Sequence, residues 1–255
     1  MYANDMSFGN RVILIQSRII NYMNKMNNDF EILDPLPIQL SHAKLRKWLR
    51  LKNSKQWDEA LKLIEETQDF IQAKAIYKVS YVDAKLKDAV SIDGIGFNSR
   101  VLRKNLDAVE RVFPFAITIG DLFSKKADTT GNLVQKYYLD IIGNIALGSA
   151  RQLLEEHLQS TFALSGMSFM SPGSLADWPL EEQKPLFSLF GDGGLPIGVR
   201  LNSHMLMIPV KSISGIYFPT EIPFYSCQLC PRKACPGRKA AYSEKNSETY
   251  GVRPT

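Results

Sequence analysis

The sequence predicts an α+β fold, because helical and strand periodicities occupy different parts of the chain. Apolar residues recur at helical spacing through the first seventy residues and again in a proline-free stretch at 132–159. Beyond that stretch the period changes from 3.6 to 2, and turn residues separate the alternating segments. Helices followed by clustered antiparallel strands are typical of α+β folds rather than of parallel α/β winding. The 255 residues, 45% of them hydrophobic, suffice for one or two cores.

The first 33 residues are predicted to form an amphipathic helical extension. Asn27, Asn28 and Asp29 end the periodic region, and Pro35 and Pro37 then mark a boundary. The main domain is therefore expected to begin at residue 34. The apolar positions of the extension, about one helical turn apart, are Val12, Ile15, Ile19, Ile20, Met23 and Met26.

Three further helices are expected in the main domain. Ser41 can cap a helix whose apolar face holds Leu45, Trp48 and Leu49. Apolar residues at helical spacing predict a second helix over 57–70. The 132–159 stretch would be the longest helix, about 40 Å at 1.5 Å per residue. Its small residues around position 146 would let another element approach closely.

The strand predictions begin at residue 77 and continue to residue 218. Alternating or short apolar runs predict strands at 77–82 and 90–92, and a strand buried on both faces at 112–119. Pro114 lacks an N–H donor, which favours an edge or a bulge there. Residues 197–201 and 205–210 should form a hairpin, followed by a strand at 213–218.

The charge distribution is basic and uneven. The net charge is +5, and six basic side chains lie between residues 41 and 57 without an acidic one. A second basic block lies beyond residue 226. Neither block belongs to a recognisable nucleic-acid-binding motif, so solvated surfaces are the simpler interpretation and nucleic acid is not an expected partner. No uniformly apolar run of membrane-spanning length and no secretory signal is visible, so a cytoplasmic protein without a membrane partner is expected.

Three cysteines, Cys227, Cys230 and Cys235, form one local cluster. Two thiolates separated by two residues can bind one metal ion, and the third would add another ligand. An iron–sulfur cluster or zinc is therefore a candidate cofactor, and zinc would need a distant fourth ligand such as His204. In the alternative interpretation, residues 226–255 form a basic tail in which the three cysteines are reduced thiols that bind no metal.

Two segments carry a family resemblance: residues 171–183 (SPGSLADWPLEEQ) and 197–218 (IGVRLNSHMLMIPVKSISGIYF). They resemble the activation domain of cobalamin-dependent methionine synthase, and the similarity extends more loosely over residues 34–225. The resemblance implies a C-shaped domain with a twisted antiparallel sheet and surrounding helices. It also implies that the domain holds S-adenosylmethionine and presents its methyl group to an oxidised corrinoid during reductive reactivation.

The resemblance also implies which residues contact the ligand. A turn of Ser171, Pro172 and Gly173 would bring backbone groups to the adenine, because glycine places no Cβ in the way. Tyr225 would line the same pocket. Two positions depart from the family pattern: Phe169 stands where an arginine usually pairs with the ligand carboxylate, and Ser174 stands where a tyrosine is usual. Losing a charge-assisted pair predicts S-adenosylmethionine binding weaker than is typical of the family.

Two functions follow as hypotheses. In the first, the chain is an accessory subunit that supports reductive reactivation of a corrinoid-bearing methyltransferase, such as methionine synthase, with cobalamin on that partner and an electron donor as a further partner. In the second, the chain is a non-catalytic docking protein or an iron–sulfur redox adaptor for a corrinoid protein and does not use S-adenosylmethionine. The sequence shows no Walker motif and no nucleophile triad that would indicate independent chemistry.

Overall fold

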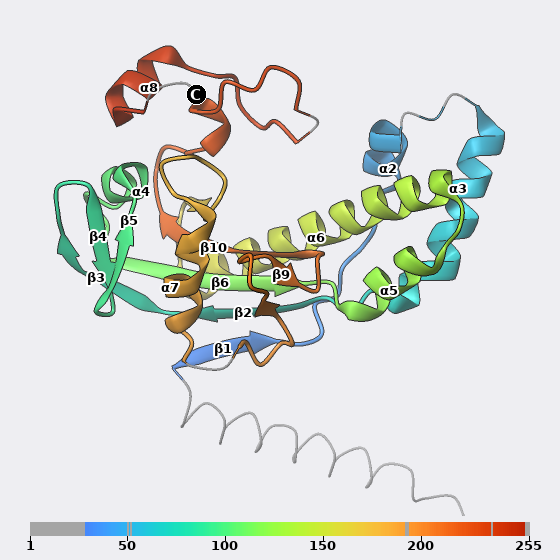
Figure 1. Cartoon of the computed structure of the whole chain (residues 1–255), viewed down its shortest axis with the longest axis horizontal. Coiled ribbons are helices and arrows are strands. Elements are labelled where there is room, and N and C mark those ends of the chain that lie inside the picture. Colours follow the sequence, from blue (N-terminus) through green and yellow to red (C-terminus); the bar gives the residue numbers. More distant parts are fainter. Residues whose placement is uncertain (1–28, 50, 52, 192–193, 236, 253–255) are drawn as a thin grey trace, which may run out of the picture.

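A curled antiparallel sheet of eight strands forms the centre of the molecule (Figure 1). The computed structural model describes residues 29–49, 51, 53–191, 194–235 and 237–252. The strand order is β1-β2-β6-β3-β4-β5, and β10 pairs with both β6 and β7. The strands are β1 (Phe30–Leu33), β2 (Lys74–Lys78), β3 (Ser80–Lys85), β4 (Ala89–Ile92), β5 (Ile95–Asn98), β6 (Arg111–Thr118), β7 (Met167–Met170) and β10 (Ser212–Pro219), with β8 (Arg200–Leu201) and β9 (Met207–Ile208) in a separate ribbon.

Helices surround this sheet, which confirms the α+β prediction. In Figure 1, α2 and α3 rise at one end of the sheet and the C-terminal part of the chain rises at the other, giving a C-shaped outline. None of the described helices is both long and apolar enough to cross a membrane. The helices are α2 (His42–Leu49), α3 (Ser54–Thr67), α4 (Arg100–Asn105), α5 (Asp121–Thr129), α6 (Leu133–Phe162), α7 (Gln183–Ser188) and α8 (Glu244–Tyr250), with short 3₁₀ turns η1 (Gln68–Phe70), η2 (Leu180–Glu182) and η3 (Ser226–Gln228).

The long helix α6 packs along the sheet in the first hydrophobic core. Its N-cap is Asn132, whose side-chain oxygen accepts hydrogen bonds from the N–H groups of Val134 and Gln135 at 2.9 and 3.3 Å. The close approach predicted for this helix is present at Gly143, where a Cβ would lie 2.9 Å from the Phe123 ring of α5. The buried helix face packs with Phe113, Phe115, Ile117 and Tyr217 of the sheet.

Of the two alternatives predicted from Pro114, an edge or a bulge, the edge is wrong, because β6 is the central strand. It pairs with β10 on one side and with β2 and β3 on the other. On that second side, β2 pairs with residues 115–118 and β3 with residues 111 and 112. Pro114 lies between these two pairings, where β6 has no ladder partner on that side, so a residue without an N–H is tolerated.

The N-terminal boundary at residue 34 also needs correction. Phe30–Leu33 form β1, which pairs antiparallel with β2 from Phe30↔Lys78 to Leu33↔Ala75. The sheet therefore begins before the predicted start of the domain. The rest of the predicted amphipathic helix, residues 1–28, lies outside the described residues.

The C-terminal segment, defined here as the described residues of 226–252, packs against the domain rather than forming a separate tail. Leu229 is only 2% exposed and belongs to the second hydrophobic core with Trp178, Phe218 and Phe224. The Tyr250 hydroxyl of α8 donates to Asn105 Oδ1 of α4 at 3.0 Å. These contacts bring the segment next to β7 and β10, where the candidate site lies.

Candidate functional site

The turn at residues 171–173 directly follows β7 and is held by internal hydrogen bonds. The N–H of Gly173 donates to the carbonyl of Trp178 at 2.7 Å, and the hydroxyl of Ser174 donates to the carbonyl of Ser171 at 2.6 Å. Gly173 has φ +80°, a left-handed conformation that strains residues with a Cβ. Because Trp178 is 0% exposed, the turn is anchored in the second core.

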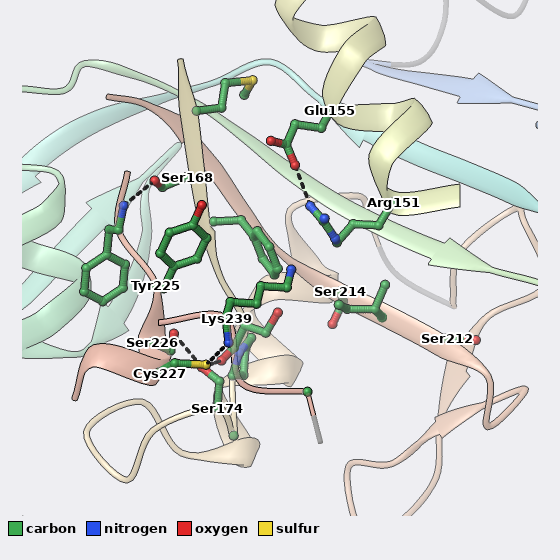
Figure 2. A pocket seen from close by; sticks show the side chains of 18 of the residues that line it. Arg151, Glu155, Ser168, Ser174, Ser212, Ser214, Tyr225, Ser226, Cys227 and Lys239 are labelled. Carbon is green, nitrogen blue, oxygen red and sulfur yellow. Dashed lines mark hydrogen bonds and ion pairs between the residues drawn. The ribbon is translucent and has the colours of Figure 1, made fainter. Parts of the chain in front are cut away.

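The turn lines a cavity of about 660 Å³ (Figure 2). The predicted binding residues Ser171, Pro172, Gly173 and Tyr225 all line this cavity, so the structure brings them together. Its other walls come from β7, β10, α6 and the C-terminal segment. The volume lies within the range usual for pockets that enclose a small organic ligand, about 300–1,000 Å³.

A hydrogen-bonding group is free at the bottom of the turn. The buried hydroxyl of Ser171 has no partner among the described residues. A Cβ on Gly215 of β10 would lie 2.3 Å from the carbonyl oxygen of Met170 and 2.9 Å from the Ser171 Oγ, so β10 and the start of the turn are in close contact. A buried hydroxyl without a partner is costly, which favours a ligand that bonds to it.

Three charged side chains that the sequence analysis missed also line the cavity: Arg151, Glu155 and Lys239. Arg151 and Glu155 lie one turn apart on α6, with Arg151 Nη1 2.5 Å from Glu155 Oε2 and 3.0 Å from the Tyr217 hydroxyl. Figure 2 shows the Lys239 side chain extending towards Arg151 across the cavity. Burial lowers the pKa of Lys239, and the positive charge of Arg151 adds to this effect.

Phe169 occupies an aromatic cluster beside these charges. Its ring centroid lies 6.0 Å from that of Phe115 and 5.2 Å from that of Tyr217. The Arg151 guanidinium lies over the Phe169 ring at 5.0 Å from its centroid, and Lys239 Nζ lies at 5.6 Å. Phe169 carries no charge of its own, but two cationic side chains, those of Arg151 and Lys239, lie over the face of its ring.

The structure does not support the predicted metal site. Among the residues that the structure describes, no three His, Cys, Asp or Glu side chains are grouped so that they could hold a metal ion. Cys227 lines the cavity, whereas Cys230 and Cys235 do not. The short spacing of the three cysteines brings them into one loop without converging their side chains, and the proposed fourth ligand, His204, belongs to the β8–β9 ribbon.

An arginine organises that loop through hydrogen bonds to its backbone. Arg238 donates to the backbone carbonyls of Cys227, Ala240 and Cys230 at 2.9, 3.1 and 3.0 Å, and also to that of Arg232. One guanidinium therefore satisfies several carbonyls of an irregular loop. Arg238 follows the last cysteine by three residues, but its partners are backbone groups and cannot be predicted from spacing.

Together, the curled sheet, the helices around it and the cavity beside β7 and β10 define an α+β domain with a cavity large enough for a small organic ligand. A solved structure of this class is the MetH reactivation domain bound to AdoHcy, which superimposes with a TM-score of 0.56 at 12% sequence identity and covers 88% of this chain and 86% of that one. The chain therefore has the fold of the MetH reactivation domain, as the family resemblance implied. A scan against family models and a search of curated proteins found no match.

Proposed function

We propose that the cavity binds S-adenosylmethionine and its product AdoHcy, and that the protein supports reactivation of a corrinoid-bearing methyltransferase such as methionine synthase. The observation that carries the proposal is the convergence of the 171–173 turn and Tyr225 on one cavity, in a chain with the fold of the MetH reactivation domain. The solved domain is described as bound to AdoHcy.

The side chains present fit such a ligand. The 171–173 turn offers backbone groups and the unpartnered Ser171 hydroxyl to a polar heterocycle. Tyr225, 40% exposed, offers an aromatic surface at the rim. Arg151, Glu155 and Lys239 provide both signs of charge for an α-amino-acid group. S-adenosylmethionine supplies the methyl group, while the chain binds the ligand and orients it towards a corrinoid on the partner, with a separate one-electron donor reducing that corrinoid.

Docking to a corrinoid protein without use of S-adenosylmethionine is the competing hypothesis. Its redox version required the cysteine metal site, which the described residues do not form. Its docking version predicts a protein that does not bind the nucleoside. Ligand titration therefore distinguishes the two hypotheses.

The test is calorimetric titration of AdoHcy and S-adenosylmethionine into the full chain and its Gly173→Ala variant. We expect saturable binding by the wild type and at least a tenfold weaker affinity in the variant. A Cβ at residue 173 would lie 3.0 Å from Leu180 Cδ1, and the φ of +80° would be strained by about 1–2 kcal/mol. Both effects displace the turn.

Gly94→Ala is the matched control. Gly94 has φ +78° and lies in the β4–β5 turn away from the cavity, and a Cβ added there would meet no atom within 4 Å. The Gly94→Ala variant should lose about as much stability as Gly173→Ala and should bind AdoHcy with the affinity of the wild type. Equal affinities of the wild type and Gly173→Ala would contradict the assignment of the cavity, and no binding by the wild type would favour the docking hypothesis.

A further inference from the structure

Lys239 reaches the cavity from the C-terminal segment, which lies outside the part of the chain that carries the family resemblance. Its position is fixed by its neighbours: Arg238 bonds to carbonyls of the cysteine loop, and the backbone N–H of Lys239 lies 3.5 Å from Cys227 Sγ. The part of the cavity wall formed by the C-terminal segment is therefore held in place by hydrogen bonds. The Lys239 ammonium lies over the face of the Phe169 ring.

The cations of the cavity differ in whether they are already paired. Arg151 bonds to Glu155 and to the Tyr217 hydroxyl. Lys239 has no carboxylate within ion-pair distance in the described part of the chain, although the positive charge of Arg151 and, to a smaller extent, the negative charge of Glu155 both act on it. Two cations side by side repel each other, and an anion between them removes that repulsion. The arrangement is thus complementary to a ligand carboxylate.

Glu155 completes a site for a zwitterion. It lines the same cavity as Lys239 and lies on α6 one turn beyond Arg151. A free α-amino-acid group presents a carboxylate and an ammonium only a few ångströms apart, and both need partners when they leave water. No other carboxylate side chain among the described residues lines this cavity.

We propose that Lys239 binds the carboxylate of the ligand's amino-acid end, with Arg151 beside it, and that Glu155 receives the ammonium. This inference rests on the proposed function, because it names the part of S-adenosylmethionine or AdoHcy that each charge contacts. It assigns the C-terminal segment a direct role in ligand selectivity: nucleosides with an amino-acid end bind better than nucleosides without one.

The experiment is a matrix of titrations with the full chain. The probes are AdoHcy and 5′-methylthioadenosine, which keeps the nucleoside but lacks the amino-acid end. The variants are Lys239→Met and Lys239→Arg, with Lys233→Met as control because Lys233 is an exposed lysine of the same loop that does not line the cavity.

We expect Lys239→Met to weaken AdoHcy binding about tenfold and to change 5′-methylthioadenosine binding less than threefold. This tenfold change lies at the lower end for a charge-assisted hydrogen bond, because the Lys239 side chain is exposed to solvent. Lys239→Arg should restore most of the affinity, and Lys233→Met should match the wild type. Thermal unfolding of each variant checks that the fold is retained.

Failure of the inference and failure of the proposed function give different results. If the wild type binds neither probe, the proposed function is wrong. If the wild type binds AdoHcy and 5′-methylthioadenosine equally, the cavity does not recognise the amino-acid end, and the inference is overturned even if Lys239→Met does not fold. Equal weakening of both probes by Lys239→Met would assign Lys239 a packing role and also overturn it.

Discussion

Trp178→Ala is expected to lower the free energy of unfolding by about 3–5 kcal/mol, the range for truncating a buried aromatic side chain. Trp178 is 0% exposed and packs edge-on against Phe97 at a ring-centroid distance of 6.3 Å. Its carbonyl accepts the hydrogen bond of Gly173, so the cavity that the truncation creates lies directly behind the 171–173 turn. Urea denaturation followed by circular dichroism measures the loss.

Two substitutions control this experiment. Trp178→Phe keeps an aromatic ring, and it removes an indole N–H that has no partner among the described residues, so its cost should be much smaller. Trp57→Ala removes a tryptophan that is only partly buried and whose ring lies under the Arg46 guanidinium at 4.4 Å. An equal loss for Trp57→Ala and Trp178→Ala would show that the second core does not anchor the turn as described.

Gly215→Ala is expected to cost about 1–3 kcal/mol of stability and to weaken AdoHcy binding strongly. The new Cβ would lie 2.3 Å from the backbone carbonyl of Met170, a contact that only movement of β7 or β10 can relieve. Met170 pairs with Ile216 and immediately precedes Ser171, so this movement shifts the 171–173 turn. Denaturation and AdoHcy titration of the same preparation measure both effects.

Gly148→Ala provides the opposite control. Gly148 is an exposed glycine of α6, and a Cβ there would meet no atom within 4 Å. Alanine in a helix interior should stabilise the protein by about 0.5–1 kcal/mol without changing ligand affinity. If Gly215→Ala behaved like Gly148→Ala, the close contact of β10 with the turn would not exist in solution.

The sequence predicted those features that depend on neighbouring residues. The start of α6 near residue 132 and the periodicity of this helix are local features, because a proline-free stretch and a helix face that repeats every turn are visible in neighbouring residues. The edge alternative for Pro114 was wrong because the tolerance of a proline there depends on where β2 and β3 end opposite β6. That register is set by long-range pairing and leaves no local signal.

The candidate site, like the fold, could be predicted from the sequence only in part. Family resemblance identified the 171–173 turn and Tyr225, and the fold brings both to one cavity. Spacing alone suggested metal ligands at the cysteines, whereas the structure gives their loop an arginine with carbonyl partners. Arg151 and Lys239 could not be paired from sequence, because one lies on α6 and the other on an irregular segment that meets it only in the folded chain.

We propose that this protein uses S-adenosylmethionine to reactivate an oxidised corrinoid on a partner chain. The most direct measurement follows methyl-labelled S-adenosylmethionine in a mixture with a one-electron reductant and a corrinoid methyltransferase that lacks its own reactivation domain. We predict transfer of label to the corrinoid, with one AdoHcy formed per methyl group, when the wild type is present and little transfer with Gly173→Ala. Transfer at the same rate with and without the protein would contradict the account.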